Sequence, residues 1–207
     1  MGDVFDGVGI NYEKRTIELF CHLDQNSYPE IRRGILDMSK EKEPIWLLLD
    51  SPGGDLFAGT QTFALLRSCA SPVIGVVMGQ ASSAAALALQ GCKVRIALGD
   101  LSIVGLHEPT AWVGPFEGKS ETFVRQNEQA IKAIMSAFTT RDSNPDYASR
   151  IEALISAKTA LFTEDALKED LVDAVIIDRK TVRTIDGEVA FEKFMEDNKL
   201  PNLELPF

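Results

Sequence analysis

Residues 78–89 read MGQASSAAALAL. The segment begins as the end of an apolar run of strand length and continues as an alanine-rich run of helical length, with Ser83 at the junction. The first N–H groups of a helix have no partner within it, so a hydroxyl at this junction lies beside free hydrogen-bond donors. Acyl transfer needs a nucleophile and an oxyanion site in that relation. We therefore predict an α/β fold that presents Ser83 at a tight turn between a strand and a helix.

Short β-type runs alternate with helical runs on both sides of this turn, which is typical of an α/β domain with parallel strands. The expected strands are 16–21, 45–49, 73–78, 94–98 and 102–106, and the expected helices are 29–40, 57–69 and 84–90. Right-handed crossovers place the ends of such strands at one edge of the sheet. We expect the Ser51-Pro52-Gly53-Gly54 turn, the Ser83 turn and His107 to converge there.

The character of the chain changes after His107. Residues 109–118 read as a loop, and residues 121–141 predict a long amphipathic helix with Phe123 and Phe138 on its apolar side. The remaining expected elements are helices over 147–157 and 164–169, a strand over 171–177, and a hairpin with its turn at Asp186-Gly187 followed by a short helix.

Composition and charge narrow the class of protein. The 207 residues include 21 basic and 31 acidic ones, a net charge of −10 without a basic cluster, which argues against nucleic acid as the main partner. The apolar runs are far shorter than the roughly 20 residues that span a bilayer, and the first residues carry no secretory or myristoylation signal. Cys21, Cys69 and Cys92 are isolated and lack metal-ligand spacing. We expect a cytoplasmic protein with reduced thiols that uses no metal and no cofactor and binds no membrane.

Three segments carry residue types that acyl transfer uses. Ser83 would be the nucleophile, His107 the base that takes its proton, and the Gly53-Gly54 backbone a donor to the oxyanion. Each has a structural alternative when taken alone: a serine before a helix is most often an N-cap, a Pro-Gly-Gly run a turn, and a lone histidine a core or loop residue. All three follow strands of one predicted sheet, where α/β folds place their sites, so the catalytic interpretation is favoured.

The segments SPGGD, MGQASSAAA and GLHEP resemble the motifs of the Clp protease proteolytic subunit family, which are of the type SPGG, GQAAS and a histidine before Gln-Pro. Gly54 precedes Ser83 by 29 positions, as in that family, and Ser83 precedes His107 by 24 positions, one fewer than in the family. The resemblance covers residues 14–177. It implies a ClpP/crotonase-like α/β fold, a repeated β-β-α spiral with a protruding helical handle.

The same resemblance implies a role for each matching residue. Ser83, rather than Ser82, is the nucleophile, and His107 is the general base. The oxyanion donors are the N–H groups of Gly54 and of Ala84, which stands where the family usually has methionine. The residues implied to flank an extended peptide substrate as strands are Asp55, Leu56, Glu108, Pro109 and Thr110.

The resemblance also implies an organisation and partners. It divides the chain into a short N-terminal segment (1–15), a peptidase domain (16–177) with a handle over 109–141, and a C-terminal extension (178–207). In the family the handles interlock two rings, which implies a homo-oligomeric ring, single or stacked, that hydrolyses peptides or unfolded proteins inside its chamber, with or without help from an ATPase. The segment before Thr16 is shorter than the family's axial loop and the extension is added, which argues against an ATPase partner.

One position departs from the family pattern. In the family an aspartate before a Phe-Leu-Ser segment orients the histidine, and an ungapped trace back from Leu171-Val172-Asp173 puts Lys158 in its place. A cation cannot perform that task. We expect either another carboxylate at His107, with Glu108, Glu152 and Glu164 as candidates, or an enzyme with weak activity. A dyad of Ser83 with Lys158 as the uncertain third member would require a desolvated lysine.

Two other functions stay open at this point. A catalytically weak or inactive ring subunit with a structural role fits Lys158. A crotonase-type acyl-CoA enzyme shares the fold and a similar oxyanion arrangement. Because crotonases usually place glycine or an acid where Ser83 stands, the serine endopeptidase is favoured over the acyl-CoA enzyme.

Overall fold

A computed structural model describes residues 7–109, 121–142, 144–200 and 202–207, without the side chains of residues 121–127. The chain forms two compact units: Met1–Gly105 together with Ala160–Phe207, and Leu106–Thr159.

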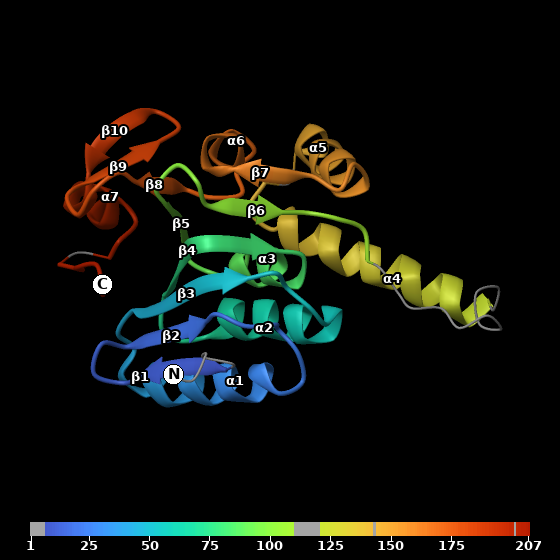
Figure 1. The fold of residues 1–207 in the computed structure, drawn as a ribbon, viewed down its shortest axis with the longest axis horizontal. Helices are drawn as coiled ribbons and strands as arrows, with labels where there is room; N and C mark the ends of the chain where they lie inside the picture. The colour runs from blue at the N-terminus through green and yellow to red at the C-terminus, as the bar shows by residue number, and fades with distance from the viewer. Residues whose placement is uncertain (1–6, 110–120, 143, 201) are drawn as a thin grey trace, which may run out of the picture. The chain divides into compact units, whose positions relative to one another are not determined.

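The first unit is built on a mixed β-sheet (Figure 1). Along the sheet the strands follow the order β1-β2-β3-β4-β5-β8-β9-β10, while β6 pairs with β4 and β7. The bounds of these strands are β1 (Val8–Asn11), β2 (Thr16–Leu19), β3 (Ile45–Ser51), β4 (Val73–Ser82), β5 (Val94–Leu98), β6 (Ile103–Gly105), β7 (Ala160–Phe162), β8 (Ala174–Ile176), β9 (Thr181–Thr184) and β10 (Gly187–Ala190). Strands β2, β3, β4, β5 and β8 pair in parallel, which confirms the α/β class.

Strand β4 belongs to two ladders in succession. Its residues 74–77 pair with β5, and its residues 80–82 pair with β6. The strand is therefore longer than the expected run over 73–78. The continuation carries the chain from the middle of the sheet directly to Ser83, so the position of the turn is fixed by strand pairing on both sides.

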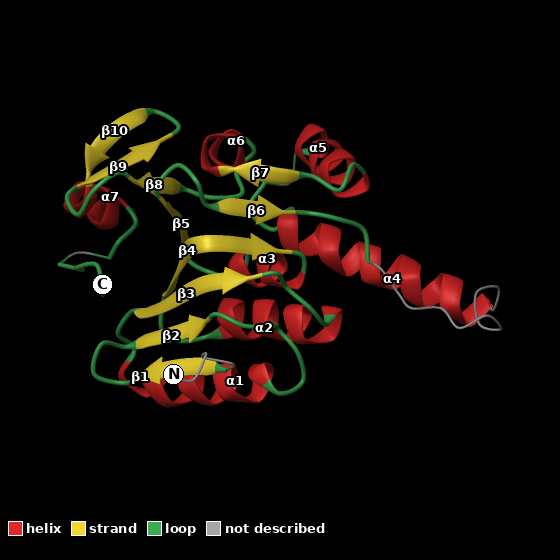
Figure 2. Ribbon diagram, in the orientation of Figure 1, coloured by secondary structure: helices red, strands yellow, loops and turns green. Residues whose placement is uncertain are grey.

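Helices cover the two faces of this sheet (Figure 2). They are α1 (Ser27–Met38) with the one-turn helix η1 (Ser39–Glu41), α2 (Leu56–Ser68), α3 (Ala84–Leu89), α6 (Thr163–Lys168) and α7 (Phe191–Asp197). Helix α3 packs so closely on β4 that a Cβ at Gly75 would lie 2.7 Å from the Leu89 side chain. On the opposite face, Trp46 and Leu48 form a core with Phe191 and Phe194 of α7.

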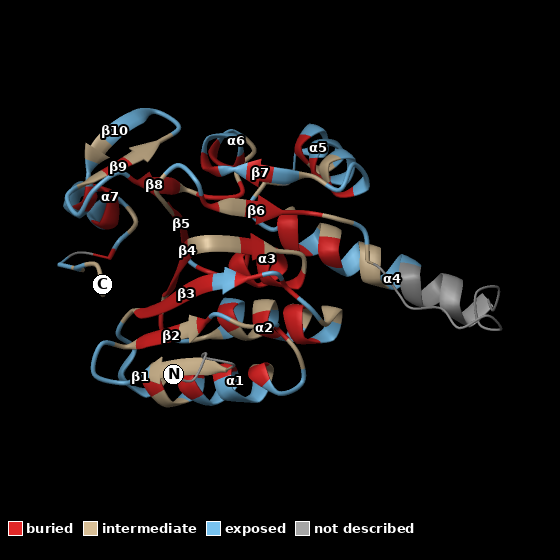
Figure 3. Cartoon of the chain, in the orientation of Figure 1, coloured by how far each residue is buried: buried red, intermediate tan, exposed pale blue. Residues whose placement is uncertain are grey.

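Successive side chains of a strand point to opposite faces of the sheet, and in the central strands both sets are buried (Figure 3). Strand β3 is an apolar run in which successive residues point to opposite faces, and Ile45, Trp46, Leu47, Leu48 and Leu49 are all buried. A strand covered on both sides reads as a continuous apolar run, which is the pattern that predicted a central strand here.

Most expected elements are confirmed within two or three residues of their bounds, including the hairpin and short helix of the tail. Two strands were not expected. Strand β1 forms an antiparallel hairpin with β2, and β7 pairs with β6 through only three residues.

The second unit is helical. It contains α4 (Glu121–Phe138) and α5 (Pro145–Ser156), which contact each other. Asn144 caps α5 by accepting a hydrogen bond from the Asp146 N–H, and Pro145 follows at the first helical position. Tyr147, Ile151 and Ile155 of α5 are buried, as are Ile134 and Phe138 of α4.

Candidate active site

Ser83 lies at the strand-to-helix turn that the sequence predicted, in a backbone conformation that non-glycine residues rarely adopt. Its φ is 54° and its ψ is −123°. The Ser83 N–H donates to the Gly105 carbonyl at 2.8 Å, which ties the turn to β6. Ser83 occupies the N-cap position of α3, yet its side chain makes no capping hydrogen bond. The simple N-cap interpretation is therefore wrong for Ser83, and its hydroxyl is not committed to the helix.

Other helices of the chain show what a capping residue does. Asp55 at the N-cap of α2 accepts from the Ala58 N–H at 2.8 Å, and Asn144 does the same for α5. Both have ordinary extended backbones. Ser83 differs in backbone and in side chain, and strained residues of this kind cluster at functional sites.

The Gly53-Gly54 loop packs against this turn. A Cβ at Gly53 would lie 2.7 Å from the Ser83 Cβ and 2.8 Å from the Ala84 nitrogen, so only glycine permits the approach. Gly53 and Gly54 have φ values of 91° and 147°, which also favour glycine. The structure thus brings together three of the predicted site residues: Gly54, Ser83 and Ala84.

Hydrogen bonds on the far side of the loop hold it in this position. The Leu23 N–H donates to the Gly53 carbonyl at 2.9 Å, and the Asp55 N–H donates to the Leu23 carbonyl at 2.8 Å. These bonds skip the Gly54 N–H, so it is directed away from Leu23 and is available as a donor. The buried Ser51 hydroxyl donates to the Cys21 carbonyl at 2.6 Å and accepts from the Gly53 N–H at 3.1 Å. This role of Ser51 could not be predicted from the sequence, which shows only that Ser51 follows a strand.

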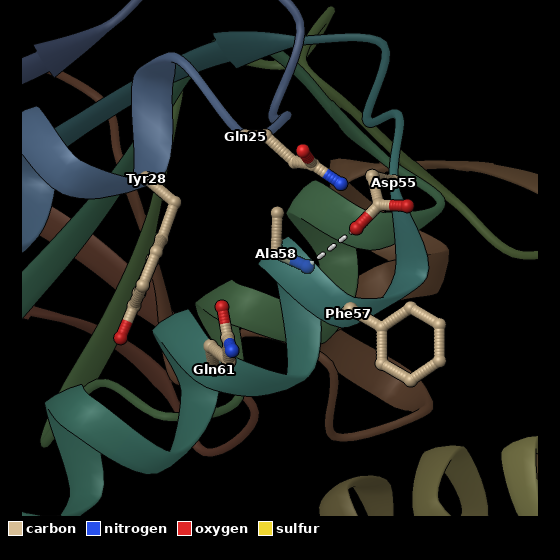
Figure 4. Close-up of a pocket in the computed structure, with 6 residues that line it drawn as sticks. All are labelled: Gln25, Tyr28, Asp55, Phe57, Ala58 and Gln61. Carbon is tan, nitrogen blue, oxygen red and sulfur yellow. Dashed lines mark hydrogen bonds between the residues drawn. The ribbon is translucent and has the colours of Figure 1, made fainter.

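Asp55 and Leu56 do not extend as a strand, so that expectation is wrong. Asp55 caps α2 and Leu56 is its first residue. They begin a helix because the Asp55 carboxylate satisfies a free N–H of the first turn. Asp55 also lines a pocket of about 290 Å³ between the starts of α1 and α2. Figure 4 shows this pocket. Its lining residues are Gln25, Tyr28, Asp55, Phe57, Ala58 and Gln61.

His107 belongs to the second unit, whereas Ser83 belongs to the first. The half-buried His107 ring has its Nδ1 atom 2.6 Å from the backbone carbonyl oxygen of Glu108. The preceding residue is anchored as well, because the Leu106 N–H donates to the Thr159 carbonyl at 2.8 Å. Strand β6 ends at Gly105, so Glu108 and Pro109 are not in a strand, and Thr110 lies outside the described residues.

Lys158 lies immediately after α5 in the left-handed conformation, with a φ of 53°. Its N–H donates to the Ile155 carbonyl at 3.1 Å, and the Thr159 N–H donates to the Leu154 carbonyl at 3.2 Å. This is the geometry of a helix C-terminal cap, which accounts for the residue structurally. The side chain is exposed, so the desolvation that a lysine base requires is not present.

The three candidate carboxylates have other surroundings. The Glu108 carboxylate lies 3.5 Å from the Ser156 hydroxyl. Glu164 pairs with Lys168 at 3.4 Å, and Glu152 is exposed on α5. In the described chain, the partner found for His107 Nδ1 is therefore a backbone carbonyl rather than a carboxylate.

A buried ionic cluster that the sequence analysis missed joins β5 to the β8 region. The Arg95 side chain is 1% exposed and lies 2.6 Å from the Asp173 carboxylate and 2.7 Å from that of Asp170. It also donates to the Gln90 side chain. Burial alone would lower the pKa of Arg95, but the two carboxylates outweigh it and raise the pKa. Arg95, which stands within the apolar run Val94–Leu98, could have signalled this cluster, because a buried guanidinium needs carboxylates.

Within the described ranges, no group of three or more His, Cys, Asp and Glu side chains is arranged to hold a metal ion. No helix in that part of the chain is both long and apolar enough to cross a bilayer.

Comparisons with known proteins match the chain over most of its length. A sequence model of the Clp protease family matches residues 3–179. A protein of Leifsonia xyli described as "ATP-dependent Clp protease proteolytic subunit 2" is 27% identical over 176 residues, which cover 83% of this chain and 78% of the relative. A Streptomyces coelicolor protein of the same description is 27% identical over 179 residues, covering 82% and 78%. A chloroplastic "ATP-dependent Clp protease proteolytic subunit 3" of Arabidopsis thaliana is 30% identical over 150 residues, covering 70% and 47%.

Proposed function

Because the chain belongs to the Clp protease family, we propose that it is a serine endopeptidase with Ser83 as nucleophile and His107 as general base. The observation that carries the proposal is the Ser83 turn. A serine with a positive φ, a side chain that makes no capping hydrogen bond and the Gly53-Gly54 loop packed against it has no structural explanation as a helix cap. It has one as a nucleophile beside two backbone donors.

The proposed reaction follows acyl-enzyme chemistry. Ser83 Oγ attacks the carbonyl carbon of the peptide while its proton passes to His107 Nε2. The oxyanion that forms accepts hydrogen bonds from the Gly54 and Ala84 N–H groups, each worth about 10² to 10³ in turnover. His107 then gives the proton to the leaving amine. Water, deprotonated by His107, cleaves the acyl-enzyme and restores the Ser83 hydroxyl.

Substrate binding is proposed for the segments on both sides of these donors. Asp55, Leu56, Glu108, Pro109 and Thr110 are the residues concerned. The pocket beside Asp55 has the size for one side chain of a bound peptide, and its lining offers the Gln25 and Gln61 amides for hydrogen bonding.

The assembly is part of the proposal. The relatives are described as proteolytic subunits of ATP-dependent proteases, which supports a homo-oligomeric ring for this chain. We propose the spiral peptidase fold with residues 109–141 as the handle between rings, in the cytoplasm. Help from an ATPase stays open, because the C-terminal extension of this chain is an addition to the family pattern.

Labelling with a fluorophosphonate tests the proposed nucleophile. Ser83→Ala should abolish labelling and peptide hydrolysis, whereas Ser82→Ala should keep the labelling. The matched pair is informative because both hydroxyls lie at the same turn. Label found on Ser82, or no label on the wild-type protein, would contradict the assignment.

One observation favours a second candidate, an inactive ring subunit. Lys158, which an ungapped trace puts where the family has an orienting aspartate, acts as a helix cap. A protein that forms rings but takes no label would establish this alternative. Binding of coenzyme A instead of labelling would point to the crotonase-type enzyme.

A further inference from the structure

We propose that the backbone carbonyl of Glu108, held in place by Pro109, positions His107 in the way that the carboxylate of a catalytic triad does. The inference rests on the proposed function, since it concerns how His107 acts as a base. It is drawn entirely within the second unit, where His107, Glu108 and Pro109 are adjacent.

The geometry determines which ring nitrogen carries the proton. His107 Nδ1 lies 2.6 Å from the Glu108 carbonyl oxygen, which is a hydrogen-bond distance. A carbonyl oxygen can only accept, so Nδ1 must be the donor. A neutral imidazole with its proton on Nδ1 has its lone pair on Nε2. His107 is thereby set in the tautomer that a general base requires.

Neighbouring residues fix the direction of this carbonyl. Glu108 precedes Pro109, and a residue before proline is restricted to extended conformations. On the other side, the Leu106 N–H is bonded to the Thr159 carbonyl, so the chain is anchored one residue before the histidine. The acceptor is therefore held by covalent geometry on one side and by the hydrogen bond between Leu106 and Thr159 on the other.

The side chains at the α5 end have hydrogen-bond partners or charges of their own. The Thr159 hydroxyl donates to the Leu154 carbonyl at 2.9 Å. Lys158 carries a cation, which cannot accept a hydrogen bond. The Glu108 carboxylate lies near Ser156.

A backbone carbonyl can replace a carboxylate in only some of its functions. It fixes the ring orientation and the tautomer but brings no full negative charge to stabilise the imidazolium that forms during attack. In the serine protease triad, replacing the aspartate by asparagine lowers turnover about 10⁴-fold because the tautomer is wrong. In His107 the tautomer is the one that a general base requires. We therefore expect the turnover to lie less than 10⁴-fold below that of an enzyme with the orienting carboxylate.

Nitrogen-15 NMR of histidine-labelled full-length protein tests the proposal, with magic-angle spinning so that assembly does not matter. At a pH where the ring is neutral, His107 should show a protonated Nδ1 and an unprotonated Nε2, with signals assigned by loss in His107→Gln. Glu108→Gln should keep this tautomer because it keeps the carbonyl. Pro109→Gly should produce a tautomer mixture and lower kcat roughly 10- to 100-fold with a smaller change in KM. The signals of His22 should stay unchanged in both variants.

A wild-type His107 protonated on Nε2, or a tautomer lost in Glu108→Gln but kept in Pro109→Gly, would overturn the proposal. The first result would mean that the carbonyl is not bonded, and the second that the carboxylate positions the ring. Fluorophosphonate labelling of Ser83 keeps the two proposals apart. A protein that takes no label but shows the Nδ1-protonated ring refutes the proposed function and leaves the positioning of His107 intact.

Discussion

Ser83 has a backbone conformation that glycine adopts more readily than serine, with a φ of 54° and a ψ of −123°. Holding a non-glycine residue in such a region typically costs about 1–3 kcal/mol. Ser83→Gly should therefore increase the free energy of unfolding by an amount in that range while it removes the nucleophile. Ser83→Ala keeps the Cβ and should show no such gain.

Urea denaturation of the two variants beside the wild type measures this difference. Equal stabilities for Ser83→Gly and Ser83→Ala would show that the turn stores no strain. A gain confined to glycine would mean that the chain gives up stability to present this hydroxyl, as enzymes commonly do at their sites.

Lys158 also has a positive φ, of 53°, but there it has a structural role. Its left-handed conformation closes α5, a place where glycine is the preferred residue. Lys158→Gly should raise the stability of the protein by about 1 kcal/mol, and Lys158→Ala should not. Both variants should keep peptidase activity, whereas His107→Ala should abolish it. Thermal denaturation measures the stability of the variants, and a peptide hydrolysis assay measures their activity. If Lys158→Ala is inactive and His107→Ala is active, the Ser-Lys dyad is right and His107 is not the base.

Arg95 shows how one side chain connects two elements of the fold. Its guanidinium is buried between β5 and the turn before β8, where Asp173 and Asp170 neutralise it. Removing one partner of a buried ion pair leaves an uncompensated charge and typically costs about 3–5 kcal/mol. The double variant Asp170→Ala/Asp173→Ala, which leaves the Arg95 guanidinium without either carboxylate, should be destabilised by an amount toward this range, while Arg95→Met, which removes the buried charge itself, should lose less.

Equilibrium unfolding in guanidinium chloride measures the free energy of unfolding of both variants. The expected order depends on exposure, because the Asp173 side chain is 20% exposed and can be hydrated once Arg95 is gone. The reverse order would show that the hydrogen bonds made by Arg95 matter more than its charge.

The C-terminal segment covers one face of the sheet. Leu203, Leu205 and Phe207 pack against the core that contains Trp46, and the Pro206 carbonyl accepts a hydrogen bond from Lys14. Deleting residues 201–207 should expose part of this core, lower the melting temperature and shift the Trp46 fluorescence to longer wavelength. The experiment requires a Trp112→Phe background so that Trp46 is the only reporter. An unchanged emission maximum would mean that the segment does not cover Trp46.

The local sequence pattern was sufficient to predict those elements whose own residues specify their structure. The apolar run over Ile45–Leu49, the Pro52-Gly53-Gly54 break and the alanine-rich α3 each specify strand, turn or helix from a few neighbouring residues. Strand β1 was missed because it is four residues long and has no buried residue, and strand β7 because it is a three-residue pairing whose stability comes from a distant partner. The Arg95 cluster was missed for the same reason, since its partners are more than seventy positions away.

In the candidate site, too, some features could be predicted from local sequence and others could not. Ser83, Gly54 and Ala84 could be placed together because each follows a strand of one sheet. The helix α2 was predicted to begin at Phe57, and the N-cap chemistry of Asp55 could have moved its start to Leu56, but the resemblance suggested a strand over Asp55 and Leu56. The bond between His107 and the Glu108 carbonyl has no signature in sequence, because it depends on backbone direction rather than on residue type.

At the scale of the whole molecule, the proposed ring has to form from strongly acidic subunits. Each chain of 22.7 kDa carries a net charge of −10, so copies repel one another at low ionic strength. The apolar side of α4 does not supply the whole attraction, since Ile134 and Phe138 are already buried. Large exposed side chains elsewhere, Phe57 at 75% and Leu101 at 83%, are further candidates for burial in an assembly.

We therefore expect the protein to elute as a multiple of 22.7 kDa in size-exclusion chromatography with light scattering, and the assembled fraction to rise with salt. The Debye length falls from about 30 Å at 0.01 M salt to about 10 Å at 0.1 M, which screens repulsion between whole subunits while leaving apolar contacts intact. Ser83→Ala serves as the control, because it should assemble like the wild type and have no peptidase activity. A monomer at micromolar concentration across this salt range would refute the chamber and leave a peptidase that acts, if at all, as a single subunit.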